Sequence, residues 1–125
     1  MRMTGMDLGA ALLAALLVAG AAVGGVSVAL GAHPWWAVKT GVVGALLGFA
    51  VYAALRLWRV SRVRTLLVGV LIFALGWAAA YFGKQEFVGS HARNGLAGQF
   101  WFLGWFAVSA GASAALAGAF ACIRR

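Results

Sequence analysis

Four apolar stretches, each long enough to cross a lipid bilayer, set the strongest constraint on how this chain can fold. A hydrocarbon core about 30 Å thick requires roughly 20 residues of α-helix. The first stretch, residues 8–32, holds no charged side chain. The others are residues 36–57, 65–82 and 100–121. We therefore predict an all-α integral membrane protein, a four-helix bundle that forms a single domain over residues 1–125.

The composition excludes the main alternative, a soluble globular domain. Hydrophobic residues make up 65% of the 125 residues and charged residues 10%, whereas soluble domains carry roughly 25% charged residues. The net charge of +8 would suggest a nucleic-acid partner in a soluble protein. Here most of the basic residues flank apolar stretches, so we interpret them as topology signals and expect membrane lipids, not nucleic acid, as partners.

The basic residues also predict the orientation of the helices. The connection between the second and third stretches carries the densest positive charge, and the positive-inside rule places such a loop in the cytoplasm. Alternation then puts seven basic residues inside and three outside, with both termini in the cytoplasm. The turn at 31–34 makes the first two helices an antiparallel hairpin, and a second hairpin follows. We expect a bacterial inner (plasma) membrane, with lipid headgroups contacted by Arg56, Arg59, Arg62 and Arg64.

The longest connection, residues 84–99, is predicted to be a loop on the outer face. Gly89, Gly95, Gly98 and Asn94 lie within it, and such residues oppose a continuous helix. It is the one connection with room for a site.

Glycines recur at intervals of seven residues in the last three apolar stretches. A seven-residue period stays on one face of a helix that supercoils to the left. Small residues on such a face let helices approach closely in lipid, where little hydrophobic drive exists between them. The predicted packing glycines are Gly41, Gly48, Gly69, Gly76, Gly104, Gly111 and Gly118. The same pattern would also suit a strip left free for a partner subunit or a second copy.

Aromatic and charged residues concentrate at the predicted outer interface. A membrane-interface belt accounts for tryptophan and tyrosine at this level, and Lys39 can extend its ammonium group to the headgroups. The run at 100–106 is denser than such anchoring requires. As a specific contact surface for a partner or lipid we predict Lys39, Glu86, His91, Arg93, Trp101 and Trp105.

Residues that carry chemistry are scarce. The chain has two acidic residues, two histidines and one cysteine, so an intramolecular disulfide is excluded. Asp7 stands where it would cap the first helix. His33, His91 and Glu86 share the outer face but lack the spacing of metal ligands. We expect no metal, no cofactor and no enzymatic activity, and the absence of an acid within the four stretches disfavours proton-coupled antiport.

These observations predict a non-catalytic accessory, assembly or scaffolding subunit of a larger membrane complex. Its partners would be other integral membrane subunits or a second copy of itself. The alternative is a small homo-oligomeric transporter or channel. In that case Ser109 and Ser113 of the last stretch would be the best candidates for a polar path.

Overall fold

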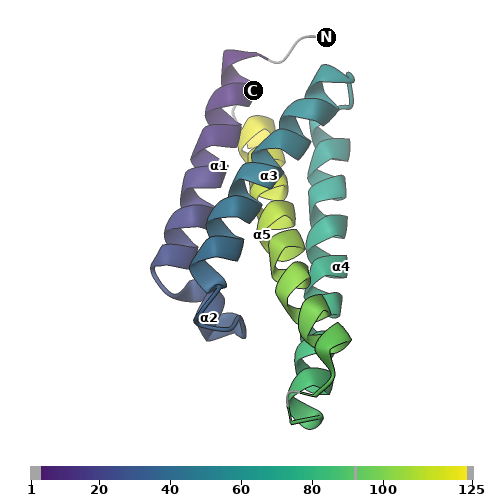
Figure 1. Cartoon of the computed structure of the whole chain (residues 1–125). Helices are drawn as coiled ribbons and strands as arrows, with labels where there is room; N and C mark the ends of the chain where they lie inside the picture. The colour runs from purple at the N-terminus through teal and green to yellow at the C-terminus, as the bar shows by residue number, and fades with distance from the viewer. Residues whose placement is uncertain (1–3, 92, 124–125) are drawn as a thin grey trace.

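The computed structural model describes residues 4–91 and 93–123, and this part of the chain forms five α-helices without a strand (Figure 1). Four of the helices are long and apolar enough to cross a membrane, which confirms the predicted all-α membrane class. The helices are α1 (Gly5–Val23), α2 (Val26–Leu30), α3 (Ala37–Leu57), α4 (Arg62–Gly89) and α5 (Gly95–Ile123).

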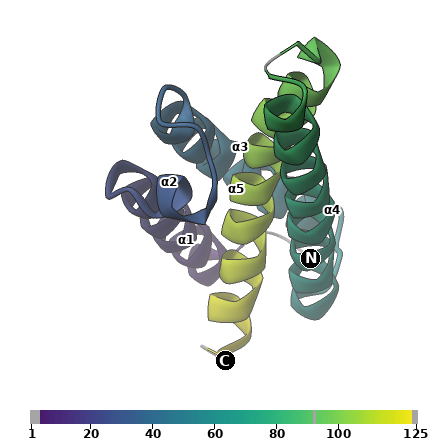
Figure 2. The ribbon, with the colours of Figure 1, turned by 90° about the horizontal axis from the view of Figure 1, so that it is seen from below.

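Helix α5 occupies the centre of the bundle. It contacts α1, α3 and α4, whereas α4 packs almost entirely on α5 and touches α3 only slightly. Seen from below, α5 lies between α4 and the pair formed by α1 and α3 (Figure 2). The start of α1, the α3–α4 turn and the end of α5 lie together, and we call this the α3–α4 end (Figure 1). The opposite α4–α5 end holds the α2–α3 and α4–α5 turns.

The first apolar stretch is not one helix, which corrects the prediction of a continuous span over residues 8–32. Helix α1 begins at Gly5 and ends at Val23. Gly25 then adopts a left-handed backbone with φ of 95°, a conformation that glycine accepts without the steric cost of a Cβ atom. The chain turns there and continues into the short α2.

The prediction of a loop over residues 84–99 is wrong for most of that range. Helix α4 runs through Gly89 and α5 begins at Gly95, so the turn is short. The side chain of Asn94 caps α5 by accepting a hydrogen bond from the Ala97 amide, at 3.1 Å. A glycine costs a helix about 1 kcal/mol relative to alanine. At Gly98 this cost is offset by close contact, because Gly98 lies against the Phe87 ring, whereas a Cβ atom added at Gly89 or Gly95 would meet no heavy atom within 4 Å.

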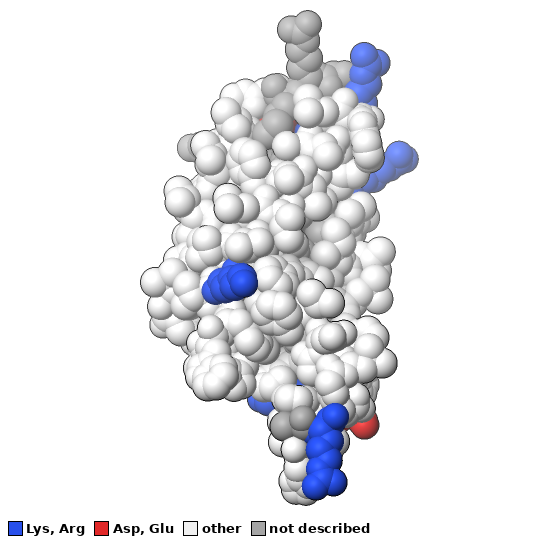
Figure 3. All heavy atoms as spheres, in the orientation of Figure 1, with Lys and Arg blue, Asp and Glu red and all other residues white. Residues whose placement is uncertain are grey.

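The extra turns give the two hairpins different lengths. At 1.5 Å per residue, the 28 residues of α4 extend about 42 Å, against about 28 Å for the 19 residues of α1. The α4–α5 hairpin therefore projects past the α2–α3 turn (Figure 1). On the face that Figure 3 shows, most charged side chains lie toward the two ends, and one basic side chain lies between them.

The predicted packing glycines all lie at helix contacts. A Cβ atom added at Gly76 would come within 2.7 Å of the Ala107 Cβ atom on α5. One added at Gly104 would come within 2.6 Å of the Ala80 amide nitrogen on α4. Gly69, Gly111 and Gly118 also lie in the α4–α5 contact, Gly48 meets α5, and Gly41 meets Ala22 of α1. Backbones approach closely along the whole α4–α5 seam as a result.

Candidate functional sites at the two ends of the bundle

A buried ionic cluster lies at the α3–α4 end and is centred on Asp7, whose side chain is fully buried. Its Oδ1 atom accepts hydrogen bonds from the Tyr52 hydroxyl at 2.8 Å and from Arg62 Nε at 3.0 Å. Arg56 donates to both carboxylate oxygens, from Nε and NH2, each at 3.3 Å. One carboxylate thus joins α1, α3 and the start of α4.

Asp7 also performs the capping role expected from the sequence. Its amide donates to Thr4 Oγ1 at 3.1 Å, and the Thr4 amide donates back to Asp7 Oδ2 at 3.1 Å. This reciprocal arrangement is a capping box, which satisfies backbone donors that the first turn of a helix leaves free.

The arginines at this end divide into two pairs, although all four were expected at lipid headgroups. Arg56 is 4% exposed, so it lies inside the protein instead of among headgroups. Arg62 is 21% exposed in its side chain and pairs with Asp7. Arg59 and Arg64 are exposed, and for these two the contact with lipid headgroups stays a prediction. Asp7 could have indicated this pairing from the sequence, because it is the one acidic residue among the basic residues of the predicted cytoplasmic side.

The geometry of this cluster suits a structural role. Every buried side-chain nitrogen and oxygen in the described part of the chain has a hydrogen-bond partner. A buried charge is costly unless it is paired and bonded, and here the carboxylate has charged partners on both neighbouring helices. The cluster therefore fastens three helices to one another.

The two serines proposed for a polar path lie within the contact between α3 and α5. Both are buried, and the Ser113 hydroxyl donates to the Ala45 carbonyl oxygen at 3.1 Å. Ser109 lies against Gly44. Both serines thus belong to helix packing inside one chain.

An aromatic cluster joins the hairpins at the α4–α5 end. Trp101 and Trp105 are only 8% and 4% exposed, so they face the interior, in contrast to the predicted contact surface. Trp101 Nε1 donates to the Gly31 carbonyl oxygen at 3.0 Å, and its ring meets that of Trp36 edge-on at 5.3 Å. Trp105 meets Trp77 of α4 at 5.8 Å. These contacts hold α5 to the segment between α2 and α3 on one side and to α4 on the other.

The other members of the predicted contact surface are exposed. Lys39 lies on α3, Glu86 lies one turn from the end of α4, and His91 and Arg93 lie in the α4–α5 turn. The structure therefore separates the predicted set into Lys39 on α3, an exposed polar tip of Glu86, His91 and Arg93 on the α4–α5 hairpin, and an internal tryptophan pair. Within residues 4–91 and 93–123, no group of histidine, cysteine or acidic side chains is arranged to hold a metal ion.

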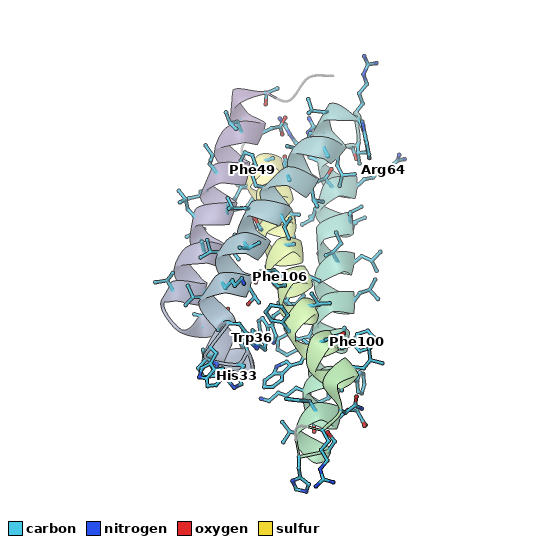
Figure 4. The ribbon with its side chains drawn as sticks, in the orientation of Figure 1. His33, Trp36, Phe49, Arg64, Phe100 and Phe106 are labelled. Atoms are coloured by element: carbon cyan, nitrogen blue, oxygen red, sulfur yellow. The ribbon has the colours of Figure 1, made fainter. Side chains whose placement is uncertain are left out.

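Two open grooves flank α5 near this end. One, of about 440 Å³, is mainly apolar, is bordered by Phe82 and Phe100, and has Glu86 and Asn94 at its edge. The other, of about 400 Å³, lies between the α2–α3 turn and α5. Figure 4 shows His33 and Trp36 on that side, and Phe100 on the opposite side of α5.

Comparison with known proteins found no family model that matches the chain, and no match among curated proteins or solved structures. The function is therefore argued from the residues of this chain.

Proposed function

We propose that the protein is a non-catalytic accessory or scaffolding subunit of a larger assembly in the membrane. The observation that carries the proposal is the position of α4. Only 22% of its most apolar 18-residue window is buried, compared with 50% for α5. A membrane helix that packs on one neighbour presents most of its circumference to lipid or to the helices of other proteins.

The exposed face of α4 has the composition of a helix-packing surface. Leu67, Leu71 and Leu75 repeat at intervals of four and are 57% to 63% exposed, and Ala74 and Ala78 lie among them. Van der Waals packing drives helix association in lipid, and the small side chains of Ala74 and Ala78 let another helix approach closely there. We expect a transmembrane helix of another subunit to pack there, with the polar tip of the hairpin contacting the same partner outside the membrane.

The internal use of polar groups supports this role over transport. The buried serines and threonines of the membrane helices donate to backbone carbonyls or pack between helices, as Thr40 does with Ala37 and Thr65 with Ser61. A transporter or channel formed by several copies would need polar groups left over to line a path. We therefore rank the homo-oligomeric transporter or channel second, and the bacterial inner membrane with both termini inside remains the proposed location.

Site-specific photocrosslinking in native membranes tests the proposal. A photoreactive phenylalanine analogue at Leu71 should form an adduct with another protein, whereas the same group at Leu46 of α3, which is 63% exposed, should react mainly with lipid. Mass spectrometry of the adduct identifies the partner. An adduct between two copies of this 12.9 kDa chain, together with ion flux in liposomes, would favour the alternative. Lipid adducts alone at Leu71 would contradict both.

A further inference from the structure

The groove between the α2–α3 turn and α5 has features of a ligand site that the proposed function does not use. Its volume is about 400 Å³, within the range of small-molecule pockets. Aromatic rings supply most of its wall, with Trp36, Phe87, Trp101 and Phe102 among them. It lies at the α4–α5 end of the bundle, between the α2–α3 turn and α5.

The rings of this groove are held in place by one another. Trp36 stacks on His33 at 6.0 Å and meets Phe102 edge-on at 5.3 Å. Phe87 of α4 meets Trp101 at 6.0 Å, and the hydrogen bond from Trp101 to Gly31 fixes the indole. A wall that is already ordered loses little entropy when a ligand binds.

Besides the indole N–H groups of its tryptophans, the groove has two polar side chains that provide hydrogen-bond donors. His33 Nδ1 accepts a hydrogen bond from the Trp35 amide at 3.2 Å, so the ring proton lies on Nε2. No hydrogen bond to another described residue uses that N–H. Gln99 also lines the groove, is exposed, and has an amide group without a bond to a described side chain or backbone. The site therefore offers an imidazole N–H and an amide NH₂ beside flat apolar walls.

The charged side chains near the groove indicate which classes of ligand it can bind. No charged residue is among the described residues that line the groove, which disfavours an anionic phospholipid headgroup. A quaternary ammonium group would gain from the aromatic faces. However, no acidic side chain lines the groove, and the Lys84 ammonium already lies 5.8 Å from the Trp101 ring. A neutral ligand with a flat ring and hydrogen-bond acceptors fits best.

We propose that this groove binds the head group of a membrane quinone. The ring of a quinone is planar and apolar, and its two carbonyl oxygens accept hydrogen bonds from donors such as His33 Nε2 and the Gln99 amide. The groove is open, so the isoprenoid tail can stay in the lipid. A sugar head group would present several hydroxyl groups to a site whose lining, among the described residues, has two polar side chains besides its tryptophans.

Binding of decylubiquinone to the full-length protein in lipid nanodiscs tests this assignment. Quenching of tryptophan fluorescence should saturate as the mole fraction of the quinone rises, because Trp36 and Trp101 form the wall. His33→Phe and Gln99→Met each remove one donor, and each should weaken binding about fivefold, the effect of one neutral hydrogen bond. The matched control is Gln85→Met on the exposed surface of α4, which should bind as the parent does.

A second variant tests the groove by its shape. Gly98→Leu should abolish the saturable quenching, because a side chain there would meet the Phe87 ring and fill the groove. If His33→Phe failed to fold, Gln99→Met would carry the test, since Gln99 is exposed. Quenching that is linear and equal in all variants would show simple partition of the quinone and overturn the proposal. So would saturable binding of monoglucosyl diacylglycerol without binding of the quinone.

Discussion

Replacing Asp7 by alanine is expected to lower the free energy of unfolding by about 3 to 5 kcal/mol, the typical effect of removing one partner of a buried ion pair. The structure accounts for this magnitude. A hydrogen bond to a charged group contributes about 1.5 to 3 kcal/mol, and a neutral one about 1 kcal/mol. Arg56 is 4% exposed and Tyr52 is fully buried, so neither can replace the lost carboxylate with bulk water. Arg62 is more exposed and can recover part of its loss by hydration.

A triple variant separates the electrostatic effect from a general packing defect. In a Tyr52→Phe background, which leaves no buried hydroxyl without its acceptor, Asp7→Leu combined with Arg56→Met and Arg62→Met removes the acid and both of its basic partners together. Apolar replacement of a complete buried ionic group is often neutral or stabilising, whereas removal of one member is strongly destabilising. The triple variant should therefore recover more than half of the stability that Asp7→Ala loses.

Equilibrium unfolding in mixed micelles, followed by circular dichroism as the fraction of dodecyl sulfate rises, measures these differences. Glu86→Ala is the matched control, because it removes the other acidic side chain, which is exposed and has no ion pair within the described residues. Its unfolding midpoint should equal that of the parent. A loss below 1 kcal/mol for Asp7→Ala, or a triple variant less stable than the single one, would refute the view that this cluster fastens the helices.

Two further predictions concern packing and orientation. Gly76→Leu should lower the free energy of unfolding by about 1 to 3 kcal/mol, as overpacking does. Gly20→Leu should leave it unchanged, since no heavy atom lies within 4 Å of a Cβ atom added there. The same unfolding assay measures both variants. In a Cys122→Ser background, a cysteine at Ser61 should react with a thiol reagent only after the inner membrane is opened, whereas one at Ser90 should react in intact spheroplasts. The positive-inside rule gives this expectation, because it places the α3–α4 end in the cytoplasm. The reverse pattern would overturn the orientation.

Hydropathy alone predicted the four membrane helices, because each apolar stretch is long enough to cross the bilayer. It could not predict their ends, since a helix continues past the hydrocarbon core wherever a neighbour supports it. Helices α4 and α5 continue through the predicted loop because each packs on the other, as Phe87 does against Gly98. In contrast, the adjacent Gly24 and Gly25 could have indicated the break after α1, which the prediction of a continuous span missed.

The inward position of the tryptophans could have been predicted. Trp101, Trp105 and Val108 recur at intervals of four and three, and they lie on the same helix face as Gly104 and Gly111. A residue on the face that carries the packing glycines must point toward a neighbouring helix. Their level at the outer interface favoured a contact surface for a partner or lipid, but their positions along α5 favoured the interior.

The pairing of Asp7 with two arginines lies beyond such reasoning, because the partners are 49 and 55 residues apart in the sequence. No local period brings them together. What places them is the up-and-down order of the helices, which returns α3 to the level at which α1 begins.

Directed bonds at the two ends and within the α3–α5 contact fix the α4–α5 hairpin on the other helices. Arg62 bonds to Asp7 at one end, and Trp101 bonds to the Gly31 carbonyl at the other. Between these points α5 packs closely on Gly44 and Gly48 of α3, and the Ser113 hydroxyl donates to the Ala45 carbonyl oxygen. Close packing of small residues does not by itself select one register, so these bonds determine how far the hairpin projects and which face of α4 it turns outward. A scaffold of the kind proposed requires that orientation to be fixed before a partner binds.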